Sequence, residues 1–114
     1  MLAVKEKGLL LYIIDHCKRV EEKIKGVDKE EFLNNEDIKE IVCFNLIQIG
    51  ELANKFSVEF LKEYPAVPWE EMRGMRNRIV HGYGTIKSEK VWGTATEDIK
   101  PLREYCEAIL ELKK

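Results

Sequence analysis

The residues best suited to chemistry lie between positions 72 and 83, where arginine, histidine and tyrosine side chains occur close together. Arg76 and His81 are five positions apart, and Tyr83 follows the histidine by two. Histidine has an unperturbed pKa near neutrality, so it can both accept and donate a proton in one reaction. Arginine keeps its charge and binds a phosphate through two donors. These residue types therefore indicate acid–base chemistry at a phosphate group.

The same segment is predicted to form a helix that buries one face. At about 100° per residue, four apolar side chains fall on one arc of the helical wheel: Met72, Met75, Ile79 and Val80. Arg76 lies in the middle of that arc. A charge on a buried face is costly unless a carboxylate or an interface satisfies it. Arg76 is therefore predicted to have an anionic partner.

Polar side chains follow an adjoining stripe of this helix and are candidate supporting residues. Arg73, Asn77 and His81 recur at spacings of four, so Asn77 could hydrogen-bond the imidazole. Arg76 and His81, however, point roughly 140° from each other on an ideal helix. The two converge only if the helix ends near His81 or if a second subunit supplies one of them.

The preceding helix supplies the candidate partner of Arg76. Its apolar residues recur at spacings of four and three from Ile38 to Phe56, with Asn45 at a buried position. A second apolar face comprises Ile41, Phe44 and Ile47. Such a helix is central in its bundle or shared with a partner subunit. Glu51, on its polar stripe, is the carboxylate best placed to meet Arg76; the alternative is a solvated surface glutamate.

The whole chain, residues 1–114, is expected to be one all-α domain, a four- to five-helix up-down bundle that dimerises through the second helix and the motif helix. The first helix should span about 3–25 and stop at Gly26. A short turn capped by Asp28 follows, and the second helix begins after Asn35. One or two turns are expected within 57–64, and the motif helix should start at Pro68 and end near 80–82. The last helix, from a cap near Ser88 to about Leu112, should be kinked by Pro101.

Composition narrows the class of protein. No apolar run reaches the length of a membrane span, and the first residues lack a signal-peptide core, so the protein is expected to be cytoplasmic. Cys17, Cys43 and Cys106 are expected to be buried thiols, because no Cys or His pair has metal-ligand spacing. His16 lies beside the apolar stripe of the first helix and is expected to be a boundary residue.

Charge is unevenly distributed along the chain. A net charge of −2 argues against a protein that coats nucleic acid indiscriminately. Yet five basic side chains stand against Glu89 alone between Met72 and Lys90. They are Arg73, Arg76, Arg78, Lys87 and Lys90. A dimer could join two such patches into a local phosphate-attracting groove.

The motif also carries a family resemblance. The run Arg76-Asn77-Arg78-Ile79-Val80-His81 resembles the Arg-polar-x-x-x-His signature of the HEPN superfamily. With Gly82 and Tyr83 added, it resembles the HepT-like toxin ribonucleases, whose genes accompany a minimal nucleotidyltransferase antitoxin. Further matches, spread over nearly the whole chain, are Gln48-Ile49-Gly50-Glu51, Tyr64-Pro65, Pro68-Trp69 and Val91-Trp92.

This resemblance implies a HEPN-like helical bundle that dimerises and cleaves RNA without a metal ion. It also implies that Arg76 and His81 are the catalytic pair. Tyr83 would be the tyrosine that the antitoxin adenylylates, although a plain boundary tyrosine is the alternative. The chain itself would need no cofactor, since ATP would be used by the antitoxin.

The residues fit that chemistry. RNA can be cleaved by its own 2′-hydroxyl if a base takes the hydroxyl proton, an acid protonates the leaving 5′-oxygen and a cation stabilises the phosphorane. One chain offers a single motif histidine, so an acid–base pair of histidines needs a symmetric dimer with both His81 side chains at one groove.

Two other functions are compatible with the sequence. A non-enzymatic companion subunit of a minimal nucleotidyltransferase could share this bundle, but the complete motif favours the nuclease. A structural helical dimer would explain the apolar faces and leave Arg76 unexplained.

Overall fold

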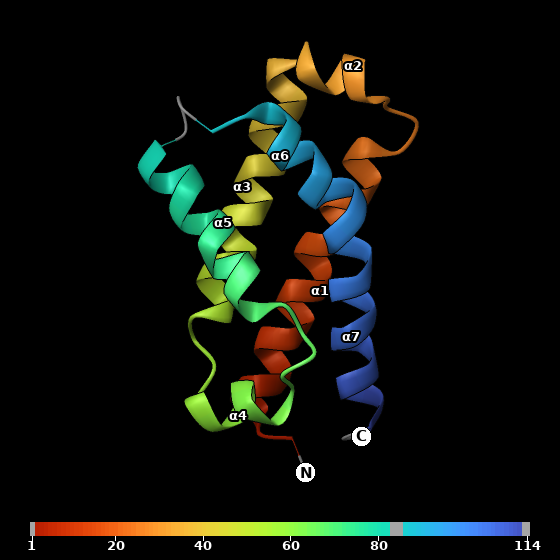
Figure 1. Ribbon diagram of the computed structural model, residues 1–114. Coiled ribbons are helices and arrows are strands. Elements are labelled where there is room, and N and C mark those ends of the chain that lie inside the picture. The colour runs from red at the N-terminus through yellow and green to blue at the C-terminus, as the bar shows by residue number, and fades with distance from the viewer. Residues whose placement is uncertain (1, 83–85, 113–114) are drawn as a thin grey trace.

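The computed structural model of the chain describes residues 2–82 and 86–112, and most of them are helical (Figure 1). In chain order the elements are α1 (Val4–Ile24), α2 (Lys29–Leu33), α3 (Glu36–Ala53), α4 (Val58–Glu63), α5 (Trp69–Gly82), α6 (Ser88–Gly93), the π-helical segment η1 (Thr94–Asp98) and α7 (Ile99–Leu112). The long helices α1, α3, α5 and α7 run alternately up and down, which confirms the predicted all-α bundle. Within the described ranges no strand occurs, and no helix has the length and apolarity needed to cross a membrane.

Local interactions set the ends of the first helices. Gly26 has φ +75°, a left-handed conformation that favours glycine, just after α1. Asp28 caps α2 by accepting a hydrogen bond of 2.8 Å from the Glu31 N–H. Asn35 caps α3 by accepting one of 3.1 Å from the Ile38 N–H. These ends lie where the sequence predicted them.

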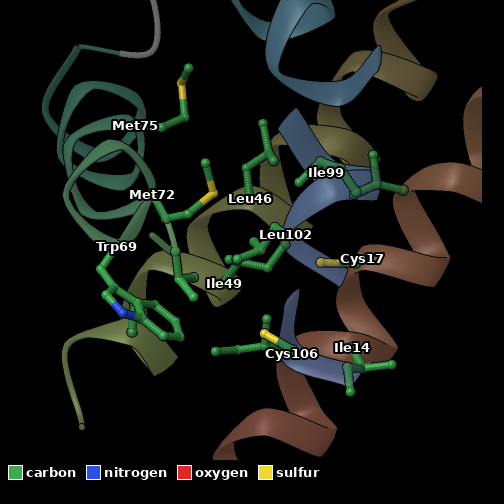
Figure 2. Packing of buried hydrophobic residues seen from close by; sticks show 14 of the residues in the cluster. Ile14, Cys17, Leu46, Ile49, Trp69, Met72, Met75, Ile99, Leu102 and Cys106 are labelled. Carbon is green, nitrogen blue, oxygen red and sulfur yellow. The ribbon is translucent and has the colours of Figure 1, made fainter. Parts of the chain in front are cut away.

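The long helices pack in the order α5, α3, α1, α7. Helix α3 contacts α5 and α1, and α1 in turn contacts α7. Their buried side chains meet in one hydrophobic cluster (Figure 2). Ile49 from α3 and Ile99 and Leu102 from α7 are almost or fully buried there. Burying each such side chain stabilises the fold by roughly 1.5–3 kcal/mol, so the shared cluster, more than local helix propensity, keeps the bundle together.

The three cysteines are buried thiols, as predicted. Burial raises the pKa of Cys43 to about 11 and the pKa of Cys106 to about 12. The pKa of Cys17 is raised further, again chiefly by burial. Because the thiolate is the nucleophile, all three side chains are unreactive thiols near neutral pH.

An aromatic cluster fixes the start of α5. The rings of Phe56 and Phe60 stack with their centroids 4.5 Å apart, and the Phe56 ring lies 5.0 Å from that of Trp69. The Trp69 indole donates a hydrogen bond of 3.1 Å to the carbonyl oxygen of Tyr64. The apolar repeat of the second helix was expected to include Phe56, but α3 ends at Ala53. Phe56 instead packs against the aromatic rings that precede and open α5.

One predicted helix start differs by one residue, and the other agrees with the prediction. Helix α5 begins at Trp69 instead of Pro68, whose carbonyl oxygen accepts the Met72 N–H at 3.2 Å. Ser88 is the first residue of α6, and Lys87 is the cap, with no side-chain capping bond. At each of these starts a backbone carbonyl, of Pro68 and of Lys87, accepts the first helical hydrogen bond.

The last helical stretch contains a π turn just before Pro101, the residue at which a kink was predicted. Thr94–Asp98 form the π-helical segment η1, and the Ile99 N–H bonds to the Thr94 carbonyl oxygen. Pro101 follows in the first turn of α7. Proline has no N–H and its ring crowds the carbonyl of the preceding turn. A widened turn immediately before it accommodates both effects.

Candidate active site

Helix α5, which carries the motif, lies directly against the backbone of α3 at Gly50. A Cβ atom placed on Gly50 would overlap the Cβ of Arg76 and stand 2.9 Å from the carbonyl oxygen of Met72. A larger residue would collide with both, so glycine is required for this contact. The aliphatic stem of Arg76 therefore rests against α3 at this point.

Replacing Gly50 with alanine is expected to destabilise the protein by about 1–3 kcal/mol, the usual cost of overpacking. The Met72 carbonyl belongs to the backbone and can move aside only if α5 shifts. Thermal unfolding followed by circular dichroism measures the effect. Gly74→Ala is the matched control, because a Cβ there would meet only Arg78 Nη1, at 3.6 Å. Equal melting temperatures for Gly50→Ala and the unaltered chain would contradict the close contact between α3 and α5.

The predicted ion pair between Arg76 and Glu51 is present. The Arg76 Nε donates to Glu51 Oε1, and the two side chains are 26 % and 41 % exposed. Arg76 Nη1 also donates a hydrogen bond of 2.8 Å to Asn77 Oδ1. The guanidinium on the buried-side arc is thus held by two polar partners at the edge of the core.

The prediction that Asn77 hydrogen-bonds the His81 imidazole is wrong for the described part of the chain, where the Asn77 oxygen accepts from Arg76 instead. A charged donor on the adjacent residue makes the stronger bond. Arg73, the other supporting candidate, forms an ion pair with Glu70 on its own helix. The structure therefore brings Glu51, Arg76 and Asn77 together, while Arg73 pairs one turn earlier.

His81 is exposed and opens onto a separate pocket of about 560 Å³. Helix α5 contributes Asn77, Arg78, His81 and Gly82 to its lining, the approach to α6 contributes Ile86 and Lys87, and α6 contributes Lys90. Arg76 is not among the described residues that line this pocket. Within one chain the structure thus leaves Arg76 outside the pocket that His81 lines, in keeping with their different directions on an ideal helix.

Three cations around His81 were not proposed as site residues from the sequence. Arg78, Lys87 and Lys90 had been noted only as part of a basic stretch. The sequence feature that could have identified them as site residues is the excess of basic residues between positions 72 and 90. Which of them share a pocket depends on how the chain returns past the end of α5, and sequence periodicity does not determine that.

His16 has a more specific position than a boundary residue. Its Nδ1 lies 2.8 Å from Oδ1 of Asn45, which is 4 % exposed, and Asn45 Nδ2 donates to the Ile41 carbonyl at 2.9 Å. Because the Asn45 oxygen can only accept, His16 Nδ1 carries the proton. The pair joins α1 to α3 and satisfies the buried amide predicted at Asn45.

Exposed apolar side chains lie on both helices that form the Arg76–Glu51 ion pair. Ile41 and Phe44 on α3 are 40 % and 54 % exposed, and they share a helical stripe with Glu51. Val80, one turn after Arg76 on α5, is 45 % exposed. The helical wheel predicted Val80 to be buried, and that prediction is wrong. Val80 lies on the Arg76 side of α5, at the margin of the core, so it is only half covered.

The structure does not test two of the predictions for the site, the modification of Tyr83 and the independence from a metal ion. Tyr83, the predicted modification site, lies outside the described residues. No group of three or more His, Cys, Asp or Glu side chains within 2–82 and 86–112 is arranged to hold a metal ion.

Comparisons with known proteins bear on what this arrangement does. A family model described as "Ribonuclease HepT-like" matches residues 13–109. A Methanocaldococcus jannaschii protein named "Putative RNase" is 33 % identical over 103 residues, covering 90 % of this chain and 94 % of that protein. A Thermococcus cleftensis protein named "Probable ribonuclease HepT" is 30 % identical over 97 residues, covering 85 % of this chain and 88 % of that protein. No solved structure gives a significant match.

Proposed function

The chain belongs to the HepT-like ribonuclease family, and from that premise we propose that it is a metal-independent endoribonuclease, the toxin of a toxin–antitoxin pair. The observation that carries the proposal is the position of His81, exposed at the end of α5 beside a basic pocket. A general acid–base group next to fixed positive charge is what cleavage of a phosphodiester needs.

The reaction is an attack of the RNA 2′-hydroxyl oxygen on the adjacent phosphorus. A His81 imidazole takes the hydroxyl proton as the new phosphorus–oxygen bond forms. The bond to the 5′-oxygen then breaks, and an imidazolium protonates that oxygen. The products are a 2′,3′-cyclic phosphate and a 5′-hydroxyl end. Arg76 stabilises the negative charge of the phosphorane, and Asn77 and Glu51 orient its guanidinium.

The active unit is proposed to be a homodimer. Within one chain Arg76 is bonded to Glu51 and Asn77 and is not among the described residues that line the His81 pocket. A second subunit could supply the missing group. Ile41 and Phe44 of α3 and Val80 of α5 are exposed, and covering them with another copy would remove apolar area from water. The interface would then comprise α3 and α5, and His81 of one subunit would act with Arg76 of the partner subunit.

Incubating the purified protein with single-stranded RNA, with and without EDTA, tests the proposed reaction. We expect cleavage that EDTA leaves unchanged and products that carry a 2′,3′-cyclic phosphate. Loss of activity in EDTA would rule out the metal-independent route. A folded protein that leaves RNA intact but binds a nucleotidyltransferase would favour the non-enzymatic companion role.

Control by the antitoxin is proposed to act at Tyr83. This residue directly follows Gly82, which lines the His81 pocket. An adenylyl group attached there would add a negative phosphate near the cations that attract the substrate. The RNA would then be excluded by charge and by occupancy. ATP would be consumed by the nucleotidyltransferase and not by this chain.

A Tyr83→Phe variant is expected to remain toxic when the nucleotidyltransferase is co-expressed, because the acceptor hydroxyl is gone. Growth of cells expressing both proteins, with the mass of the purified toxin, measures this. The unaltered toxin with the same antitoxin is the control. Silencing of an unmodified Tyr83→Phe toxin would show that the antitoxin acts by another route.

A further inference from the structure

The pocket beside His81 holds cations that have no anionic partner within the described part of the chain. Ion pairs engage Arg19, Arg73, Arg76, Arg103 and Lys39 elsewhere in the bundle. Arg78, Lys87 and Lys90 take part in none, and the lining that the structure describes includes no carboxylate. On a chain of net charge −2, three unpaired cations around one pocket form a distinct positive site.

The pocket is not uniformly polar. Gly82 and Ile86 contribute uncharged surface to its lining, and the aliphatic stems of the lysines add to it. Its volume of about 560 Å³ falls within the range of roughly 300–1,000 Å³ common for small-ligand sites. An apolar surface with cations at its rim suits a group that has a flat base and a phosphate.

We propose that this pocket is a nucleotide subsite for single-stranded RNA, in which Arg78, Lys87 and Lys90 bind the backbone phosphate next to the scissile one. This inference rests on the proposed ribonuclease function. The base of that nucleotide lies against Ile86 and Gly82, and the scissile phosphate is left beside His81. Arg76, which is held by Glu51 and Asn77, does not contribute to this subsite.

Single-stranded RNA fits better than a duplex for a geometric reason. A base can enter a pocket only after it leaves its stack, and unpaired nucleotides do so at little cost. Arginine grips a phosphate with two donors, and the lysines act as point charges on flexible stems. Recognition would therefore follow the backbone and depend weakly on base identity.

Salt-dependent binding of a labelled single-stranded RNA tests the subsite. Fluorescence anisotropy is measured in a His81→Ala background, so that cleavage does not interfere. Losing the neutralisation of one phosphate should flatten the slope of log K against log salt by about 0.7. Because Arg78 still faces that phosphate, Lys87→Ala with Lys90→Ala should reduce the slope by up to about 0.7 and weaken binding at low salt.

Lys5→Ala with Lys62→Ala is the matched control. Both of these lysines are exposed and lie in α1 and α4 at the opposite end of the bundle (Figure 1). This control removes the same charge and should leave the slope unchanged. An equal reduction in both double variants would mean that only overall charge matters, and the subsite would be refuted.

The remaining outcomes separate the subsite from the catalytic proposal. In the chain with His81 intact, Lys87→Ala with Lys90→Ala should raise KM for RNA cleavage much more than it lowers kcat. A reduced slope together with full cleavage by His81→Ala would support the subsite and overturn the catalytic assignment. If Lys87→Ala with Lys90→Ala leaves the salt slope of RNA binding unaltered, the subsite is overturned and the ribonuclease proposal stays intact. The same conclusion holds if this double variant still binds RNA normally and loses binding only to an acidic protein.

Discussion

A His81→Ala variant is expected to cleave RNA about 10²–10⁴-fold more slowly than the unaltered chain, the usual loss when a general acid–base group is removed. The imidazole is exposed at the end of α5, so its removal should leave the melting temperature nearly unchanged. Single-turnover cleavage of a labelled RNA measures the rate, and thermal unfolding confirms that the variant is folded.

His16→Ala is the matched control, since it removes the chain's other histidine. His16 is bonded to Asn45 and connects α1 with α3, so its loss should lower stability and leave cleavage intact at a temperature where the variant is folded. Full activity of purified His81→Ala would reject the proposed mechanism and favour the companion-subunit role.

Replacing Arg76 with alanine is expected to abolish cleavage and also to lower stability. The variant leaves Glu51 without its cationic partner and removes the aliphatic stem that packs against Gly50. Because the partially exposed pair is screened by water, the ion pair itself is worth only about 1 kcal/mol. That corresponds to a fall of about 4 °C in melting temperature for a domain of this size.

Arg103→Ala provides the control for the stability effect. Arg103 of α7 donates to both carboxylate oxygens of Glu21, at 2.6 and 3.0 Å, and these bonds raise its pKa above its usual range. Its removal should destabilise the bundle and leave kcat unchanged below the melting temperature. Wild-type cleavage by folded Arg76→Ala would remove Arg76 from the mechanism.

Mixing the inactive Arg76→Ala and His81→Ala chains tests how the site is shared. If each site takes His81 from one subunit and Arg76 from the other, the heterodimer has one intact site and activity should return. If the two histidines act together, the mixture should stay inactive. A monomer by light scattering at micromolar concentration would contradict the dimer on which both arrangements depend.

Much of this protein follows from the sequence because the determining interactions are short-range. Gly26, Asp28 and Asn35 set helix ends through bonds to backbone groups a few residues away. The pairing of Arg76 with Glu51 was also predictable, although the two are far apart in the chain. A cation on an apolar arc needs an anion, and the central helix offered one on its polar stripe.

Only the tertiary structure decided what lies around the two motif residues. Val80 belongs to the apolar arc, yet it is exposed because no described helix covers that side of α5. The Asn77 side chain could bond to Arg76 or to His81, and its oxygen accepts a hydrogen bond from the charged guanidinium of Arg76. Lys87 and Lys90 line the same pocket as His81, a juxtaposition of two segments that periodicity does not encode. Residue spacing fixes the direction of a side chain on its own helix; what the side chain meets depends on packing between segments distant in sequence.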